Sequence, residues 1–216
     1  MNVPVEYSQP WLMIVEGVLD TIFFRHLLSF RLIQGIQVHE PKDILDHQDR
    51  GGRECFSECL SAATTQTALK GVLMVSDNDT DPDASFRAVQ SQIRQAGMTA
   101  PATPLSIVDQ SDGKKLAVMM LPWTSVAGCL ETLCLSAAYD KWPDLKQPLG
   151  NYLQATPAND WETSPQSKML FRCLTATGCR RDPNAGMRVL DKSPCDFSLG
   201  HTCFDNMVNF LNQLPQ

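Results

Sequence analysis

The sequence has no excess of positive charge: 18 lysines and arginines stand against 24 acidic residues, and the net charge is −6. A protein that binds nucleic acid by charge alone needs a basic balance, so this composition argues against that class. It leaves room for a nuclease whose metal ions offset acidic side chains, or for a protein that reaches nucleic acid through a partner. The sequence also lacks an apolar run near the roughly 20 residues that span a bilayer, so we expect no membrane association.

Cys-x-x-Cys pairs are absent although the chain has eight cysteines, and their scattered spacing does not match a zinc site. The first ten residues contain Glu6 but no basic residue, which is not the pattern of a secretion signal. We therefore expect a cytoplasmic protein with reduced, mostly buried thiols; a disulfide or zinc framework is the alternative. The histidines are isolated in the sequence, and we expect structural or surface roles for His26, His39, His47 and His201.

Short apolar runs alternate with segments of helical periodicity in the first half of the chain, which is typical of a parallel sheet flanked by helices. The 216 residues suffice for one such α/β domain with additions. The turn at Asp112-Gly113 predicts that the two strands beside it pair in antiparallel fashion. Strands are predicted over residues 11–16, 36–39, 71–76, 104–108 and 115–122. Helices are predicted over residues 20–33, 53–65, 82–96, 129–140, 143–153, 165–177 and 205–214.

Four aspartates, spaced by two, follow the predicted strand 71–76: Asp77, Asp79, Asp81 and Asp83. Side chains alternate in an extended segment, which predicts that Asp77 and Asp79 lie on the same side. Two carboxylates held close together repel each other, and a hard cation such as Mg²⁺ or Mn²⁺ removes that cost. The alternative is a solvated acidic loop in which Asp81 or Asp83 caps the helix that begins near residue 82.

The first predicted strand ends in a similar way, with Glu16-Gly17 and then Asp20. In an open α/β sheet, ligands bind beyond the carboxyl ends of the strands, where the strand order reverses. If the strands 11–16 and 71–76 are neighbours, Glu16 lies on the same edge as the two aspartates. Asp20 is then either a further ligand or the N-cap of the next helix.

These two motifs, strand-Glu16-Gly-x-x-Asp20 and strand-Asp77-x-Asp79, resemble the signature of the TOPRIM fold. That fold is shared by topoisomerases, bacterial primases, recombination-repair proteins and the overcoming-lysogenization-defect nucleases. The resemblance covers roughly residues 9–125 and implies a Rossmann-like α/β core with a mainly parallel sheet flanked by helices. Residues 126–216 resemble the helical end of a small standalone TOPRIM-like family of unknown function. We expect this helical extension to pack on the core as a single compact unit.

The overcoming-lysogenization-defect nucleases have the same parts in the same order, followed by a Ser/Gly-x-x-Glu motif and a lysine. Here Gly128-Cys-Leu-Glu131 and Lys168 match those two parts. In this resemblance Lys168 stabilises charge on the phosphate, and Glu16 is a ligand or a general acid or base. Glu131 is otherwise an acid favoured in a first helical turn, and Lys168 a solvated helix residue. The ligands implied for Mg²⁺ or Mn²⁺ are Glu16, Asp20, Asp77, Asp79 and Glu131.

We therefore expect Mg²⁺-dependent hydrolysis of phosphodiesters in DNA or RNA, in which two metals contact the attacking and leaving oxygens. Such a nuclease could work with a partner such as an ATPase. The alternative is a non-catalytic or regulatory metal-binding TOPRIM module that senses a nucleotide or a nucleic-acid end and acts with a partner protein. The full set of acids favours hydrolysis, whereas the acidic net charge favours the alternative. A response-regulator receiver fits less well, because its acidic pair follows the first strand, where this chain has only Glu16.

Other features point away from the larger TOPRIM enzymes. No tyrosine has a setting that suggests a covalent phosphotyrosine, and no second domain for strand passage is predicted. Neither a topoisomerase nor a complete primase is therefore expected. Arg180-Arg181 is the one paired basic element near the helical end, and it either contacts a phosphate backbone or lies in a solvated loop. The sequence leaves the substrate and the oligomeric state open.

Overall fold

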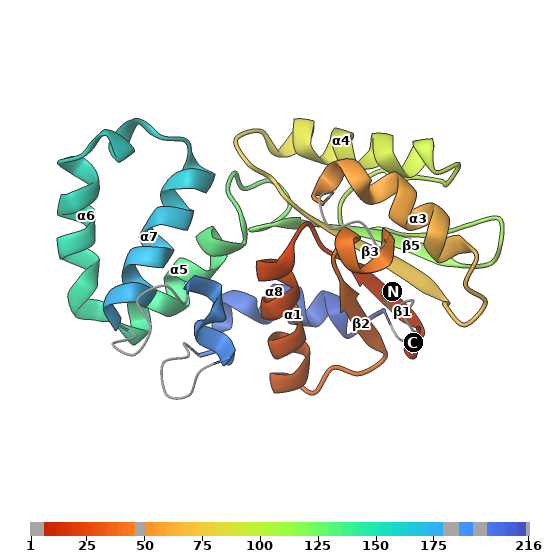
Figure 1. The fold of residues 1–216 in the computed structure, drawn as a ribbon, viewed down its shortest axis with the longest axis horizontal. Coiled ribbons are helices and arrows are strands. Elements are labelled where there is room, and N and C mark those ends of the chain that lie inside the picture. The colour runs from red at the N-terminus through yellow and green to blue at the C-terminus, as the bar shows by residue number, and fades with distance from the viewer. Residues whose placement is uncertain (1–6, 46–50, 179–185, 192–197, 215–216) are drawn as a thin grey trace.

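The protein is built around a five-stranded sheet with the strand order β2-β1-β3-β5-β4 (Figure 1). The structure, a computed structural model, describes residues 7–45, 51–178, 186–191 and 198–214. The first four strands in this order are parallel, and β4 pairs with β5 in antiparallel fashion. The α/β class and the mainly parallel sheet are therefore as predicted. The strands are β1 (Trp11–Ile14), β2 (Ile36–His39), β3 (Gly71–Asp77), β4 (Ile107–Asp109) and β5 (Lys115–Leu121).

Helices cover both faces of the sheet (Figure 1). The α-helices are α1 (Val18–Phe30), α2 (Pro41–Leu45), α3 (Phe56–Thr64), α4 (Pro82–Gln95), α5 (Leu130–Lys141), α6 (Lys146–Gln154), α7 (Thr163–Gly178) and α8 (Asp205–Leu211). Short 3-10 segments are η1 (Arg53–Cys55), η2 (Pro143–Leu145), η3 (Pro157–Asp160), η4 (Gly186–Asp191) and η5 (Thr202–Phe204). None of the helices in the described part of the chain has the length and apolar character needed to cross a bilayer.

Two apolar clusters lie on opposite faces of the sheet. Alternate residues of β1 and β3 point to opposite faces, so Met13 and Leu73 join the cluster with α1, whereas Leu12 and Val72 join the cluster with α3 and α4. Because both faces of β3 are covered, the strand is an unbroken apolar run up to Ser76. The sheet is therefore the centre of a three-layer arrangement.

The helices that follow the sheet share the core on the α1 side. Phe171 of α7, Val189 of η4 and Leu211 of α8 belong to the same buried cluster as Phe23 of α1. Helices α5 to α7 also extend beyond the sheet at the end where β1 and β3 finish (Figure 1). This position brings the helical region next to the carboxyl ends of the central strands.

Some details differ from the sequence-based expectations. The strand expected over 104–108 begins only at Ile107, because Leu105 has a left-handed backbone (φ 65°) that ends the extended conformation before it. All six cysteines in the described part of the chain are free thiols, and four of them are buried, as predicted. Cys179 and Cys195 lie outside the described residues.

Replacing two glycines, one in a crowded position on the sheet and one in an open position on a helix, tests how closely the sheet is packed. Gly71 on β3 is opposite Trp11 on β1, and a Cβ on Gly71 would lie 2.7 Å from the indole ring. We expect Gly71→Ala to lower the free energy of unfolding by about 1–3 kcal/mol, because the ring has to move. A Cβ on Gly150, within α6, would meet no heavy atom within 4 Å. We therefore expect Gly150→Ala to raise the free energy of unfolding by about 0.5–1 kcal/mol.

Urea unfolding followed by circular dichroism measures both changes against the unaltered protein. Equal stability of the two variants would contradict the close packing of the Trp11 indole on Gly71.

Candidate carboxylate site at the strand ends

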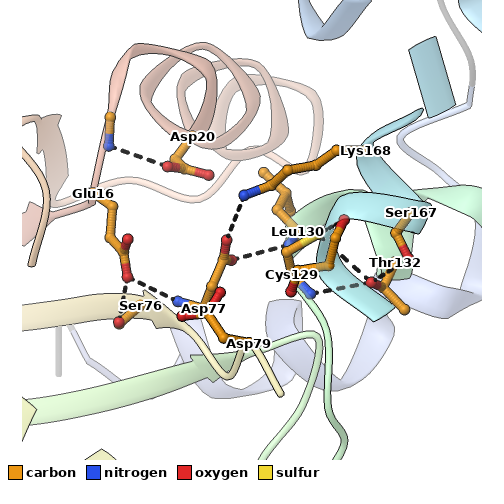
Figure 2. A network of polar contacts seen from close by, with 12 residues as sticks. Glu16, Asp20, Ser76, Asp77, Asp79, Cys129, Leu130, Thr132, Ser167 and Lys168 are labelled. Atoms are coloured by element: carbon orange, nitrogen blue, oxygen red, sulfur yellow. Dashed lines mark hydrogen bonds and ion pairs between the residues drawn. The ribbon is translucent and has the colours of Figure 1, made fainter. Parts of the chain in front are cut away.

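Strands β1 and β3 are neighbours, but the chain leaves them toward opposite faces of the sheet. Helix α1 follows β1 and packs on one face, whereas α4 follows β3 and packs on the other. The carboxyl ends of strands at such a point border a crevice where α/β proteins bind ligands. Glu16 and Asp77 lie at these two ends, and Figure 2 shows them together with Asp20 of α1 and Lys168 of α7.

Glu16 is oriented by groups at the end of β3 and in η1. Its Oε1 accepts hydrogen bonds from the Ser76 hydroxyl and from the backbone N–H of Asp77, at 3.1 Å. The guanidinium of Arg53 donates to the same oxygen, at 3.2 Å from Nη2. These contacts come from segments that are distant in sequence, and they fix the Glu16 carboxylate beside the end of β3.

Asp77 is bound by the helical region. Its Oδ1 accepts the N–H of Leu130, the first residue of α5, at 3.1 Å, where the helix dipole favours negative charge. Its Oδ2 lies 3.4 Å from Nζ of Lys168. Burial opposes the charge of Lys168, but the carboxylates of Asp77 and Glu131 outweigh it and raise the pKa of Lys168 above its ordinary value. Lys168 is therefore protonated at neutral pH.

The contact between α5 and α7 places Lys168 at the site. The Thr132 hydroxyl on α5 donates a hydrogen bond to the hydroxyl of Ser167 on α7, at 2.8 Å. The Thr132 hydroxyl in turn accepts the N–H of Cys129, at 3.1 Å. Ser167 directly precedes Lys168, so this bond fastens the turn of α7 from which the lysine extends (Figure 2).

The predicted Gly-Cys-Leu-Glu segment forms the turn into α5. Gly128 has a φ of 130°, and a Cβ there would lie 2.5 Å from the Thr132 hydroxyl, so the turn requires a glycine. The backbone of Gly128 pairs with that of Asp79 through hydrogen bonds of 2.7 and 2.9 Å. This pairing anchors the start of α5, where Glu131 is only 8% exposed. The charge of Glu131 raises the pKa of Asp20 and of Asp77.

Asp20 is the third residue of α1 and not its N-cap, as one interpretation of the sequence had it. The helix begins at Val18, and Gly17 is the N-cap. The Asp20 carboxylate accepts the Gly17 N–H at 3.1 Å, so it satisfies a backbone donor at the start of the helix. Burial raises the pKa of Asp20 from 3.8 to about 7, and the charges of Glu131 and Glu16 add to the increase.

The pKa of Asp77 is shifted in the same direction. Burial raises its pKa well above the ordinary value, and the charges of Asp20 and Glu16 raise it further, whereas the charge of Lys168 lowers it. Because the charges of Glu16 and Glu131 raise the pKa of both Asp20 and Asp77, these four side chains form one electrostatic cluster. Protonation of Asp20, whose pKa is about 7, reduces the repulsion within it.

Asp79 has partners that differ from those of Asp77. Its backbone is left-handed (φ 50°), so the alternation that predicted both carboxylates on one side ends with the strand at Asp77. The Asp79 carboxylate is exposed and lies 2.9 Å from the Arg53 guanidinium. Asp81 caps α4: its carboxylate accepts the N–H of Ala84 at 2.9 Å. The capping interpretation is therefore confirmed for Asp81.

Two residues of this region were not singled out from the sequence. Arg53 belongs to no acidic motif, yet it contacts both Glu16 and Asp79. Asn78 is fully buried, and its side-chain amide donates to the backbone oxygens of Trp123 and Val126, both at 2.7 Å. It thereby fastens the loop that precedes α5. An arginine after Gly-Gly and an asparagine between two aspartates were the signals available.

The remaining candidates lie elsewhere or outside the described residues. His39 contacts Asp43 at 3.2 Å, and His201 contacts Asp140 at 2.8 Å. Neither histidine affects the pKa values of Asp20 or Asp77. His47, Arg180 and Arg181 lie outside the described residues, so their expected roles stay predictions.

The cluster suits a hard divalent cation in donor chemistry and in charge, since its donors are carboxylate oxygens. The side chains are not arranged as a complete site: within the described residues, no group of three or more His, Cys, Asp or Glu side chains could hold a metal ion. Lys168 contacts Asp77, and Arg53 contacts Glu16 and Asp79. These cations, together with a proton on Asp20 below about pH 7, offset part of the negative charge.

A family model described as a protein of unknown function, DUF3226, matches residues 10–216. The match spans the sheet and the helices that follow it, and therefore both halves of the carboxylate cluster. No curated protein and no solved structure matches the chain.

The raised pKa of Asp20 predicts that the metal-free protein loses stability as the pH rises from 5 to 8. Between its ordinary pKa of 3.8 and about 7, Asp20 keeps a proton in the folded state that the unfolded chain has released. This contribution is fully present below pH 3.8 and is lost progressively as the pH rises toward and through 7. The Asp20→Asn protein has no carboxyl to ionise at this position, so from pH 5 to pH 8 its free energy of unfolding should fall by about 2–3 kcal/mol less than that of the unaltered protein.

Urea unfolding at pH 5 and pH 8, in the presence of a chelator, measures the difference. The same loss of stability in both proteins would contradict the raised pKa of Asp20.

Proposed function

The chain belongs to the DUF3226 family of unknown function, and we propose that it is a TOPRIM-type phosphodiesterase that requires Mg²⁺ or Mn²⁺ and acts on nucleic acid. The observation that carries the proposal is the cluster of Glu16, Asp20, Asp77 and Glu131 with Lys168 at the carboxyl ends of β1 and β3. Carboxylates with pKa values raised by burial and by like charges are typical of functional sites. They cost stability, and a divalent cation would offset that cost.

The carboxylates of Glu16, Asp77 and Glu131 would hold the ion, with the exposed Asp79 as a further ligand. A bound ion would stabilise negative charge on the attacking and leaving oxygens of a phosphodiester. Lys168 would add a positive charge at the phosphate: it is protonated, and its side chain is 45% exposed, so a substrate could reach it.

Asp20 fits the proton-transfer role better than Glu16, for which the sequence suggested it. Oε1 of Glu16 already accepts hydrogen bonds from Ser76, Asp77 and Arg53. The Asp20 carboxylate has a pKa of about 7, so it can take up or release a proton near neutral pH. In the proposal, Glu16 fixes the geometry of the cluster, and Asp20 exchanges a proton with water or with the leaving oxygen.

One observation favours a second candidate, a metal- and nucleotide-binding module without catalysis. Arg53 and Lys168 already neutralise part of the cluster, and the net charge of −6 gives little attraction for a nucleic-acid backbone. A module of this kind would act with a protein partner, such as an ATPase, that supplies the contacts to nucleic acid.

Cleavage of plasmid DNA, single-stranded DNA and RNA in Mg²⁺ and in Mn²⁺ tests the first candidate. We expect the unaltered protein to cleave at least one of them, and Asp77→Asn/Asp79→Asn to be at least about 100-fold slower because it lacks two ligands. The matched control is Asp83→Asn, which removes an exposed acid from the first turn of α4 and should leave cleavage unchanged.

Calorimetry with Mn²⁺ on the same three proteins separates the candidates. Binding by the unaltered protein without cleavage would favour the binding module. No binding by the unaltered protein would contradict both candidates, since each depends on a metal at the cluster.

A further inference from the structure

Arg53 places a positive charge in the crevice, and it belongs to neither of the acidic motifs. Arg53 begins η1, directly after Gly52. Gly52 has a φ of 79°, and its N–H donates a hydrogen bond to the Glu16 carbonyl oxygen at 3.1 Å, so the chain turns toward the site. Nη2 of Arg53 lies 3.2 Å from Glu16 Oε1, 2.8 Å from the Asp77 carbonyl oxygen and 2.9 Å from Asp79 Oδ2. One side chain thus joins the end of β1 to the end of β3.

Arg53 also lines a hollow of about 400 Å³ between η1 and α4. Glu16 and Asp79 belong to the same lining, so the hollow is continuous with the carboxylate site. Gly52 and Ala88 leave space within it, Gln92 supplies an amide, and Glu54 is a third carboxylate in the lining, so a phosphate would enter only with a divalent cation that offsets these acids. A hollow of this volume is in the range of sites that accept small ligands or a portion of a larger one.

We propose that this hollow receives a phosphate group of the substrate, and that Arg53 transfers from the carboxylates to that phosphate when metal binds. The inference rests on the proposed function, because it takes the metal and the phosphodiester from there. It adds a binding site and a residue that the acidic motifs do not include. Arg53 binds and positions the substrate; it has no part in proton transfer.

Competition for the same oxygens is the physical reason for the transfer. A divalent cation that binds Glu16 and Asp79 takes the carboxylates that Arg53 contacts. The Arg53 side chain is only 18% exposed, so its charge requires another anion once those contacts are lost. The planar fork of a guanidinium matches two oxygens of a phosphate. Metal and phosphate should therefore strengthen each other's binding at this site.

Arg53→Met separates the two roles of the arginine. Without its competing charge, we expect Mn²⁺ to bind about 5–10-fold more tightly in calorimetry, the change that corresponds to loss of a partly buried ion pair. A fluorescently labelled single-stranded oligonucleotide, titrated in Ca²⁺ and followed by anisotropy, should bind about 10-fold more weakly. Electrophoresis after each titration verifies that the oligonucleotide is intact.

Arg53→Lys and Arg94→Met are the matched controls. The lysine keeps the charge but lacks the fork, so Mn²⁺ affinity should change by less than about 2-fold while oligonucleotide binding falls several-fold. Arg94 is an exposed residue in the last turn of α4, and its replacement removes one positive charge without reaching the hollow, so both affinities should be unchanged. The lysine variant also decides the question if Arg53→Met does not fold.

Two results would overturn the inference. Weaker Mn²⁺ binding by Arg53→Met would mean that Arg53 holds Glu16 and Asp79 in place for the ion and does not compete with it. Unchanged oligonucleotide binding in both Arg53 variants would mean that no phosphate reaches the hollow. If the unaltered protein binds no Mn²⁺, the proposed function itself fails; if it binds Mn²⁺ and Arg53 has no effect, only this inference fails.

Discussion

Repulsion among carboxylates that are partly buried at the ends of β1 and β3 is the interaction that the surrounding structure has to balance. The N–H of Leu130 and the ammonium of Lys168 bind Asp77, while Ser76 and Arg53 bind Glu16. Burial and the charges of Glu131 and Glu16 also raise the pKa of Asp20 to about 7, so a proton on Asp20 offsets part of the repulsion below that pH. The hydrogen bonds and ion pairs of the crevice thus offset part of the negative charge of these carboxylates.

The helices after the sheet contribute directly to this balance. Lys168 is 91 residues from Asp77 in sequence. It reaches the crevice because α7 packs on α5, and the first turn of α5 lies beside the end of β3 in space. The same helices share an apolar cluster with α1 and the sheet. A change in the packing of α5 and α7 would therefore alter the charge around Asp77 as well as the stability of the fold.

Local sequence patterns predicted much of the fold, and they predicted the carboxylate site in outline. The apolar run 71–76 and the Asp112-Gly113 turn predicted β3 and the antiparallel pairing of β5, because both signals depend on adjacent residues. The candidate acids were likewise visible, and the structure brings four of them, two at strand ends and two in the first turns of α1 and α5, into one cluster. Asp79 was predicted less well, because alternation applies only while the chain is extended and its backbone is left-handed.

The sequence by itself determined the α/β class, the mainly parallel order of elements and the placement of acids directly after two strands, since periodicity and turn chemistry act over a few residues. Only the tertiary structure decided that Arg53 contacts Glu16 and Asp79, and that Asp20 titrates near pH 7. Those properties depend on packing between distant segments and on the burial that results. Neither quantity is encoded in the spacing of residues along the chain.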